Sequence, residues 1–433
     1  MKAELISVGT ELLLGNIVNT NAQYLSRELA ELGITVQRQS TIGDNADRLA
    51  EWVDEAKRRC DLLVFTGGLG PTADDLTKET VAACYGDSLQ FDAVEWEKIA
   101  AYFARIGRLP TENNRKQAMV PVHGQKIVNA HGTAPGVWFE QDGHMAVLMP
   151  GVPREMKAMW QESVRPRLAA MQQVTLHSLT LRVIGGESSI EAAVAPLLEN
   201  ENPTAAIYCK TGECEIRITA RAEDAAQGEA LCRAYAEKFR TVLGDAVYDA
   251  DVPGIAATVV RILRERGLTL ATAESCTGGL IAEQLTEVPG ASNVFGYGYV
   301  TYWEQAKARM IGVSPAVIER WNVVSAQVAA QMAAGAQQAS GADAALSVTG
   351  VAGPDGGDAE RPVGTVYAAA AYQGHVWVDR LSLPASTGRQ AIRQRAALYA
   401  LDMVRRAVLG LEMPGRQLSL AQAQSADFAK GEN

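Results

Sequence analysis

The sequence predicts an α/β protein of several domains, because three stretches of the chain carry three different patterns of secondary structure. Residues 1–170 alternate strand-like and helix-like segments, which favours a doubly wound, mostly parallel sheet. Residues 171–250 have the pattern of a small α+β unit, and residues 253–412 that of a second α/β domain. The length of 433 residues agrees with two or three domains.

The composition is that of an ordinary soluble globular protein, with 47% apolar and 21% charged residues. A net charge of −10 argues against a surface that binds nucleic acid directly. The six cysteines form no C-x-x-C pair, so neither a disulfide framework nor a zinc site is indicated. No signal peptide is evident, and no apolar run approaches the ~20 residues of a membrane span. We therefore expect a cytoplasmic protein without membrane attachment.

In the first domain, the strands and helices follow one another in the order of a doubly wound sheet. Ligands of such sheets bind beyond the carboxyl ends of the strands. Acidic residues stand at several of these ends, and we expect Glu11, Asp44, Asp74 and Asp75 to meet on one rim, although a lone acid such as Asp44 is more commonly a helix N-cap. The predicted strands cover 3–8, 34–41 and 61–65, and the predicted helices 21–32 and 46–58.

The stretch 66–79 carries the main functional signal of this domain. A buried strand ends there in Gly67, Gly68 and Gly70, and the acids Asp74 and Asp75 open a helix. Backbone N–H groups in such a turn point at a bound phosphate, and glycine allows close approach. Because carboxylates repel phosphate, a divalent cation between acid and ligand is the natural interpretation. The alternative is an acidic first turn that complements the helix dipole.

The last domain opens with an apolar run, 268–273, that ends at Glu274-Ser275-Cys276-Thr277-Gly278-Gly279 before a helix. A nucleophile at such a turn has helix N–H groups beside it, which could stabilise an oxyanion or hold a phosphate. The alternative is that these hydroxyl residues only cap the helix.

A serine nucleophile needs a base, and the histidines do not supply one. His375 is the only histidine of this domain, and it alternates with apolar residues in a predicted strand, which argues against a Ser-His-Asp triad. A lysine with a lowered pKa could serve instead, and Lys307 is the leading candidate, with Tyr302 as a proton relay. The alternative is that Lys307 is an ordinary solvated lysine on a helix.

Residues 1–170 resemble the N-terminal half of the CinA family (competence/damage-inducible protein A), which is related to the molybdopterin-binding domains of MogA and MoeA. The resemblance rests on residues 9–15, 19–22, 41–45, 66–79, 113–118, 132–136 and 150–153. It implies a metal-dependent pyrophosphatase acting on ADP-ribose, with Mg, Co or Mn as the divalent metal. The metal would be held by Asp44 and Asp75, with Asp74 beside them, and the substrate by Thr10, Glu11, Asn21, Gly67, Gly68, Gly70 and Lys116.

Residues 273–279, 300–307, 349–357 and 362–366 resemble the C-terminal CinA domain. That domain occurs alone as PncC, a nicotinamide-mononucleotide amidohydrolase that needs no cofactor. The resemblance implies Ser275 as nucleophile, assisted by Lys307 and Tyr302. The substrate site would comprise Cys276, Thr277, Gly278, Gly279, Thr349, Gly350 and Gly353, and charge and position alone add Arg389 and Arg393 as phosphate ligands. This chain departs from the family pattern at Trp303-Glu304, where Ser-Asn is common, and at Ala326, where Glu is frequent.

The middle unit fits the KH-like domain of the same family. An RNA-binding KH domain needs a G-x-x-G loop, and Gly185-Gly186-Glu187-Ser188 lacks that spacing. We therefore interpret this unit as a spacer or a dimerisation element, and we expect a homodimer. The polar residues 413–433 predict a disordered tail.

The leading hypothesis is an enzyme with two small-molecule substrates, ADP-ribose and nicotinamide mononucleotide, that recycles pyridine nucleotides. One rival is a non-catalytic partner protein in DNA uptake or repair, which the acidic composition does not favour for direct DNA contact. The other is a molybdopterin-binding protein, which leaves the turn at Ser275 unexplained.

Overall fold

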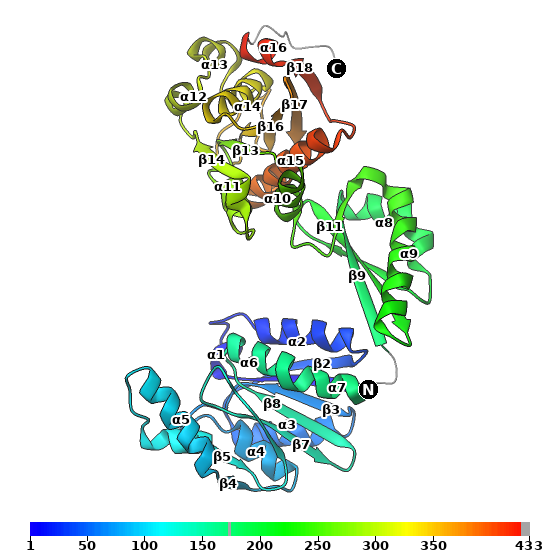
Figure 1. The fold of residues 1–433 in the computed structure, drawn as a ribbon, viewed down its shortest axis with the longest axis vertical. Coiled ribbons are helices and arrows are strands. Elements are labelled where there is room, and N and C mark those ends of the chain that lie inside the picture. Colours follow the sequence, from blue (N-terminus) through cyan, green and yellow to red (C-terminus); the bar gives the residue numbers. More distant parts are fainter. Residues whose placement is uncertain (172–174, 426–433) are drawn as a thin grey trace. The chain divides into compact units, whose positions relative to one another are not determined.

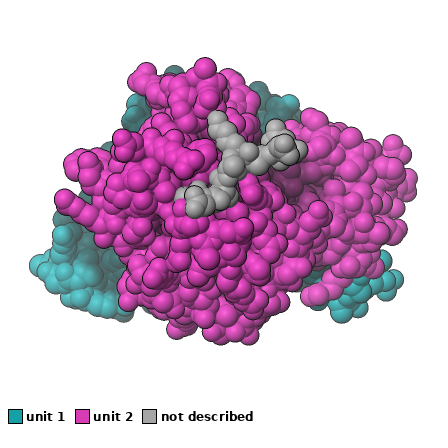
Figure 2. All heavy atoms as spheres, turned by 90° about the horizontal axis from the view of Figure 1, so that it is seen from above, with its two compact units in different colours: residues 1–178, 220–231 teal, residues 179–219, 232–433 magenta. Residues whose placement is uncertain are grey.

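The structure, a computed structural model, describes residues 1–171 and 175–425. The chain divides into two compact units (Figure 2). One contains residues 1–178 with 220–231, and the other contains residues 179–219 with 232–433.

The first domain is built on a six-stranded sheet in the order β2-β1-β3-β8-β7-β6 (Figure 1). The first four strands run parallel, and β7 and β6 join antiparallel at one edge. The strands are β1 (Lys2–Val8), β2 (Thr35–Ile42), β3 (Leu62–Thr66), β6 (Gln125–Ile127), β7 (Gly136–Gln141) and β8 (His144–Met149).

Both faces of this sheet are covered, which confirms the doubly wound architecture. Alternate strand residues point to opposite faces. Leu5 and Val64 pack in the core that also contains helix residues such as Leu25 and Met156, whereas Ile6 and Phe65 pack in the other core. The covering helices are α2 (Thr20–Glu31), α3 (Ala46–Lys57), α4 (Thr77–Cys84), α6 (Pro153–Met159) and α7 (Arg165–Met171), with a π-helical turn at Trp160–Val164, whereas the short α1 (Thr10–Leu13) has no buried residue. A side lobe holds β4 (Leu89–Phe91), α5 (Ala93–Arg105), a 3-10 helix (Glu112–Ala118) and β5 (Met119–Pro121).

The middle domain is a four-stranded sheet in the order β10-β11-β9-β12, with two helices. β10 and β11 form an antiparallel hairpin, and β12 returns antiparallel to β9. The elements are β9 (Thr175–Ile184), α8 (Glu187–Leu198), β10 (Thr204–Cys209), β11 (Glu213–Ala222), α9 (Ala225–Leu243), a 3-10 turn (Gly244–Ala246) and β12 (Val247–Ala250).

The C-terminal domain is a three-layer α/β structure around a six-stranded sheet in the order β14-β13-β15-β16-β17-β18. β14, β13 and β15 run parallel, and the remaining strands antiparallel. One core contains residues of α10, α11 and α15, and the other is centred on α14. The strands are β13 (Leu270–Glu274), β14 (Phe295–Val300), β15 (Ala344–Gly350), β16 (Thr365–Tyr372) and β17 (His375–Ser382). The helices are α10 (Ile255–Arg266), α11 (Leu280–Thr286), α12 (Glu304–Ile311), α13 (Pro315–Trp321), α14 (Ala326–Ser340) and α15 (Arg389–Leu409), with 3-10 turns at Ala291–Asn293 and Ala385–Thr387.

The prediction of a disordered tail over 413–433 is wrong for its first part. β18 (Arg416–Ser419) pairs with β17 as the last strand of the sheet, and α16 (Leu420–Ser425) follows. Leu418 and Ala423 are buried, so two apolar side chains in a polar stretch are enough to anchor it. Residues 426–433 lie outside the described part of the chain.

Helix α15 touches both the C-terminal sheet and the part of the middle domain that belongs to the same compact unit, residues 179–219 and 232–250. Near its middle, Leu398 lies so close to the tip of the β10–β11 hairpin that a Cβ on Gly212 would come within 3.0 Å of its side chain. Near its end, Arg405 donates to the carbonyl of Asp245 at 2.8 Å. Within residues 1–171 and 175–425, no helix is long and apolar enough to cross a lipid bilayer.

Candidate functional site

The turn that follows β13 presents Ser275 at the carboxyl end of the sheet. All five residues of β13 are buried, which fixes the position of the strand end. The chain then reverses into α11 through two residues with left-handed backbone angles, Gly278 (φ 59°) and Gly279 (φ 95°). Side chains other than glycine rarely adopt these angles, so the two glycines shape the turn.

Ser275 and Lys307 form a buried hydrogen-bonded pair. The Lys307 Nζ lies 3.0 Å from the Ser275 Oγ and also donates to the Thr301 carbonyl at 2.7 Å. Lys307 is fully buried although it lies on α12. Burial lowers the pKa of its ammonium group to about 8, against an opposing effect of the nearby Glu304 carboxylate. A neutral amine at this place can accept the serine proton, as in Ser-Lys enzymes.

Cys276 is the other nucleophilic side chain of the turn. It is buried, and burial raises the pKa of its thiol to about 12. Because the thiolate is the reactive form, this thiol is inert at neutral pH. The geometry therefore favours Ser275 as the nucleophile.

Glu274, to which the sequence analysis assigns no role, holds the turn together. Its buried carboxylate accepts hydrogen bonds from the N–H groups of Gly279 (2.9 Å), Ile281 (3.1 Å) and Ala282 (2.9 Å). Its backbone carbonyl accepts from the Thr301 N–H at 2.8 Å, so it also supports the segment whose carbonyl holds Lys307. An acid directly before a strand-to-helix turn is a helix-capping signal that could have revealed this role.

This cap changes the expectation that the N-terminus of α11 receives an anion. The Glu274 carboxylate already occupies the helix N–H groups that an oxyanion or a phosphate would need. In the described part of the chain, the N–H groups of Cys276 and Thr277 donate no hydrogen bond to a backbone carbonyl. These two are therefore the amides available for an oxyanion next to Ser275.

A cavity of about 540 Å³ opens in front of Ser275. This volume lies in the range of small-ligand sites. Its two charged lining residues are Glu304 and Arg389. Arg389 donates to the Gly353 carbonyl at 2.7 Å and to the Tyr302 hydroxyl at 3.1 Å. The other lining residues are Ser275, Cys276, Tyr302, Trp303, Gln305, Val323, Val324, Thr349, Gly350 and Ala352.

Three predicted residues of this site have other contacts. Arg393 donates to the Thr277 carbonyl at 2.6 Å and does not line the cavity, so it supports the turn. The Thr349 hydroxyl donates to the Val323 carbonyl at 2.8 Å. The Tyr302 hydroxyl is bonded to Arg389, and no hydrogen bond among the described residues joins it to Ser275 or Lys307. The relay role of Tyr302 stays a prediction.

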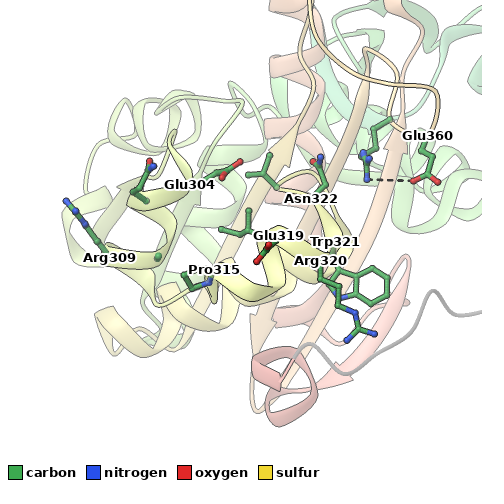
Figure 3. A pocket seen from close by; sticks show the side chains of 13 residues that line it. Glu304, Arg309, Pro315, Glu319, Arg320, Trp321, Asn322 and Glu360 are labelled. Atoms are coloured by element: carbon green, nitrogen blue, oxygen red, sulfur yellow. Dashed lines mark ion pairs between the residues drawn. The ribbon is translucent and has the colours of Figure 1, made fainter.

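A second cavity, of about 850 Å³, adjoins the first and shares Glu304, Gln305 and Val323 with it. Figure 3 shows its walls, where Glu304 and Arg309 come from α12 and Glu319, Arg320 and Trp321 from α13. Its acidic and basic side chains are mixed, and Arg361 is ion-paired with Glu360. The shared wall makes the two cavities neighbours along one face of α12.

In the first domain, Gly67 and Gly68 form a turn that larger residues cannot enter. Both have left-handed backbone angles (φ 98° and 67°). A Cβ on Gly67 would lie 2.2 Å from the Val8 carbonyl, and one on Gly68 would lie 1.9 Å from the Thr77 hydroxyl. The loop therefore packs directly against β1 and the start of α4, which explains these two glycines by packing within the protein. Their role in binding a phosphate stays a prediction.

A cavity of about 510 Å³ lies over this loop and gathers acidic residues from several strand ends. Asn21 also lines it, and the buried Oδ1 of its amide has no hydrogen-bond partner in the described part of the chain. Gly67, Gly68 and Gly70 line the cavity as expected, whereas Thr10 and Lys116 do not. The acids are Glu11, Asp44, Asp74 and Asp75, together with Glu155, which the sequence analysis missed because it follows a separate Pro-Gly turn.

Acidic side chains of this cavity are held by hydrogen bonds from neighbouring residues of the protein. Asp44 accepts hydrogen bonds from the N–H (2.9 Å) and hydroxyl (2.7 Å) of Thr10. The N-cap of α3 is the neighbouring Asn45, so Asp44 does not have the N-cap role named as its alternative. The Asp75 carboxylate accepts from the N–H and hydroxyl of Thr72 in the same way. Hydrogen bonding from Thr72 also lowers the pKa of the Asp74 carboxyl. Lys116 donates to the Asp75 carbonyl and therefore anchors the loop from outside the cavity.

The oxygen atoms that line this cavity are of the chemical type that binds a hard divalent cation. Carboxylate and amide oxygens are the ligands that Mg²⁺ takes, and Asn21 offers a buried oxygen without a partner. However, within the described residues no group of three acidic, histidine or cysteine side chains forms a ready-made metal site. A bound diphosphate would therefore have to supply part of the coordination.

Comparison with known proteins finds a matching family model for each of the three domains. Residues 4–170 match the family model described as "Probable molybdopterin binding domain", residues 178–248 match "Damage-inducible protein CinA KH domain", and residues 253–408 match "CinA C-terminal domain". A "CinA-like protein" of Kosmotoga olearia is 44% identical over 413 residues, which cover 95% of this chain and 100% of that protein. The solved structure of the competence/damage inducible protein CihA from Agrobacterium tumefaciens is 42% identical, covers 36% of this chain and 97% of its own, and has a TM-score of 0.35. That of CinA from Thermoplasma acidophilum is 35% identical, with 39% and 97% covered and a TM-score of 0.35.

Proposed function

Because this chain belongs to the CinA family, we propose that its C-terminal domain is an amidohydrolase that converts nicotinamide mononucleotide to nicotinate mononucleotide and ammonia. The observation that carries the proposal is the buried contact of 3.0 Å between the Lys307 Nζ and the Ser275 Oγ at the wall of a ligand-sized cavity. A buried lysine whose pKa is lowered by burial and whose amine touches a serine hydroxyl is the arrangement of a base with its nucleophile.

The reaction follows from this geometry. Neutral Lys307 takes the Ser275 proton while the serine oxygen attacks the carboxamide carbon. The oxyanion faces the free N–H groups of Cys276 and Thr277, and the Lys307 ammonium returns the proton to the leaving nitrogen, which departs as ammonia. Water, deprotonated by the same amine, then attacks the acyl-enzyme and releases the carboxylate product. Arg389, the one basic residue among the described residues that line the cavity, would hold the substrate phosphate.

For the first domain, the proposal is a metal-dependent pyrophosphatase that cleaves ADP-ribose. Its support is the convergence of the glycine loop and five acidic side chains on one cavity. A divalent cation, when bound, would neutralise the diphosphate and activate water. Asp44 and Asp75 would hold it, and the loop N–H groups would position the phosphates.

The rival for this domain is binding of a molybdopterin without hydrolysis, which the description of the matching family model favours. A homodimer and a cytoplasmic location remain predictions.

One assay series on the intact protein tests both activities. Ammonia release from nicotinamide mononucleotide is expected without added metal, and ADP-ribose cleavage only with Mg²⁺, Co²⁺ or Mn²⁺. Ser275→Ala should abolish the first activity and spare the second, and Asp75→Ala should do the reverse, so each variant is the folding control of the other. Full deamidation by Ser275→Ala would refute the covalent mechanism, and absence of metal-dependent ADP-ribose cleavage in the parent protein would leave molybdopterin binding as the better reading of the first domain.

A further inference from the structure

Trp303 is the most exposed large apolar side chain of the Ser275 cavity. It lies directly before α12 and is 75% exposed, although it lines the same cavity as the nucleophile. In the described part of the chain its ring makes no stacking or cation–π contact. An indole without partners at the mouth of a ligand cavity is available for contact with the ligand.

The fold itself does not require tryptophan at this position. The backbone carbonyl of Trp303 accepts from Ala306 (3.1 Å) and Lys307 (3.2 Å), a contact that any residue could provide. Its side chain makes no capping hydrogen bond to α12. The large ring therefore contributes to the cavity and not to the stability of the helix.

The charges of the cavity indicate which kind of group faces this ring. Glu304 stands next to Trp303 in sequence, and Arg389 is bonded to the Tyr302 hydroxyl and the Gly353 carbonyl. The lining of the cavity thus includes an indole, one carboxylate and one guanidinium, and the guanidinium is already bonded to a neighbouring hydroxyl and a carbonyl. A positively charged ring is attracted to the face of an indole, most strongly where water is excluded.

Building on the proposed amidase function, we propose that Trp303 binds the positively charged pyridinium ring of the substrate through its indole face, with Glu304 beside it, while Arg389 takes the phosphate. The site would then select cationic N-ribosylated nicotinamides over neutral aromatic carboxamides of the same shape. Trp303 is in this view a specificity residue, which gives a function to one of the positions where this chain departs from the family pattern.

Binding without turnover tests this directly. In the Ser275→Ala background, calorimetry compares nicotinamide mononucleotide with benzamide riboside monophosphate, which has the same size and a neutral ring. We expect the cationic nucleotide to bind about ten-fold more tightly. Adding Trp303→Leu should reduce that ratio to about one by weakening only the cationic ligand, and Trp303→Phe should retain most of it. Tyr297→Leu, at an exposed tyrosine of β14 outside the cavity, is the matched control and should change neither affinity.

Equal weakening of both ligands by Trp303→Leu would show plain apolar packing and would overturn the proposal, as would an unchanged ratio. Failure of the amidase function itself gives a different result, because the protein with Ser275 intact would then release no ammonia. If ammonia is released and the affinity ratio is insensitive to Trp303, only the present inference is wrong.

Discussion

Two glycine-containing turns, one after β3 and one after β13, have the same local structure but differ in how many of their functional side chains are already in contact. Each follows a buried strand at the carboxyl end of a sheet and leads into a helix through glycines with left-handed backbone angles. In the C-terminal domain, the Ser275 and Lys307 side chains already share a hydrogen bond, and the Glu274 carboxylate holds the N–H groups at the start of α11. In the N-terminal domain, Asp44 and Asp75 are each hydrogen-bonded to a threonine, and no group of acidic, histidine or cysteine side chains forms a ready-made metal site among the described residues.

The two arrangements correspond to two different kinds of site, a covalent catalytic site and a site for an ion with a diphosphate. A covalent mechanism needs its nucleophile and base in contact before the substrate arrives, so the protein buries both. A site for an ion and a diphosphate is completed by its ligands, so the protein supplies a backbone of the right shape and a set of carboxylates. The first should therefore be most sensitive to side-chain chemistry, and the second to backbone shape.

The largest effect is expected from Lys307→Met, which keeps the length of the side chain and removes the amine. Without its base, Ser275 should lose about 10³-fold or more in kcat for deamidation, while ADP-ribose cleavage stays unchanged. In the parent protein, kcat/KM for deamidation should rise with pH up to about 8 and then level off, because burial lowers the pKa of Lys307 to that value and only the neutral amine accepts a proton. A rate that falls between pH 6 and pH 8 would contradict the assignment of Lys307 as the base.

A smaller effect, on the other turn, is expected from Gly68→Ala. A Cβ there would lie 1.9 Å from the Thr77 hydroxyl, and the backbone angle of 67° already disfavours alanine. The loop must shift, and a displacement of this size should lower ADP-ribose cleavage by about 100-fold. Deamidation in the same preparation is the control. Gly143 is another glycine with a left-handed backbone angle, but it has free space around it, so Gly143→Ala measures the cost of the backbone angle alone. Equal losses of ADP-ribose cleavage in both variants would contradict the argument that Gly68 is needed for packing.

The smallest effect is expected from Glu274→Gln. Glutamine has one acceptor oxygen where the glutamate offers two, so at least one of the three N–H bonds at α11 weakens. Loss of a helix cap costs about 1 kcal/mol, which corresponds to a roughly five-fold decrease in kcat if the turn loosens, with KM unchanged. Steady-state kinetics and a thermal melt measure the two quantities. A five-fold change in KM alone would show that Glu274 acts on substrate binding instead.

Local signals predicted most of the fold. The doubly wound sheet, the small middle domain and the strand-turn-helix at Ser275 each depend on apolar runs and glycines that are near in sequence. The tail was predicted wrongly because its burial depends on Leu418 and Ala423, whose partner β17 is distant in sequence. The composition of a segment alone does not reveal an edge strand that forms only by pairing with a strand distant in sequence.

The candidate site was predictable in its residue types but not in its contacts. The lack of a suitable histidine pointed to Lys307, but only the structure shows its burial against Ser275. Arg389 and Arg393 are one helical turn apart, so charge and position could not separate them. The structure assigns Arg389 to the cavity and Arg393 to the Thr277 carbonyl. The role of Glu274 was overlooked because this acid stands directly before the predicted nucleophile and was interpreted as part of that motif, not as the residue that caps α11.

Helix α15 has a mechanical consequence for the C-terminal site. Its 21 residues make a rod about 30 Å long, with Arg389 in the cavity at one end and Arg405 on the middle domain near the other. A helix transmits displacement along its axis with little bending, so we expect the position of the middle domain and the position of the Arg389 guanidinium in the cavity to depend on each other. If the contact between the hairpin and Leu398 has two arrangements that move α15, a ligand that favours one of them should change affinity in the cavity, and by linkage a filled cavity should shift that contact by the same free energy.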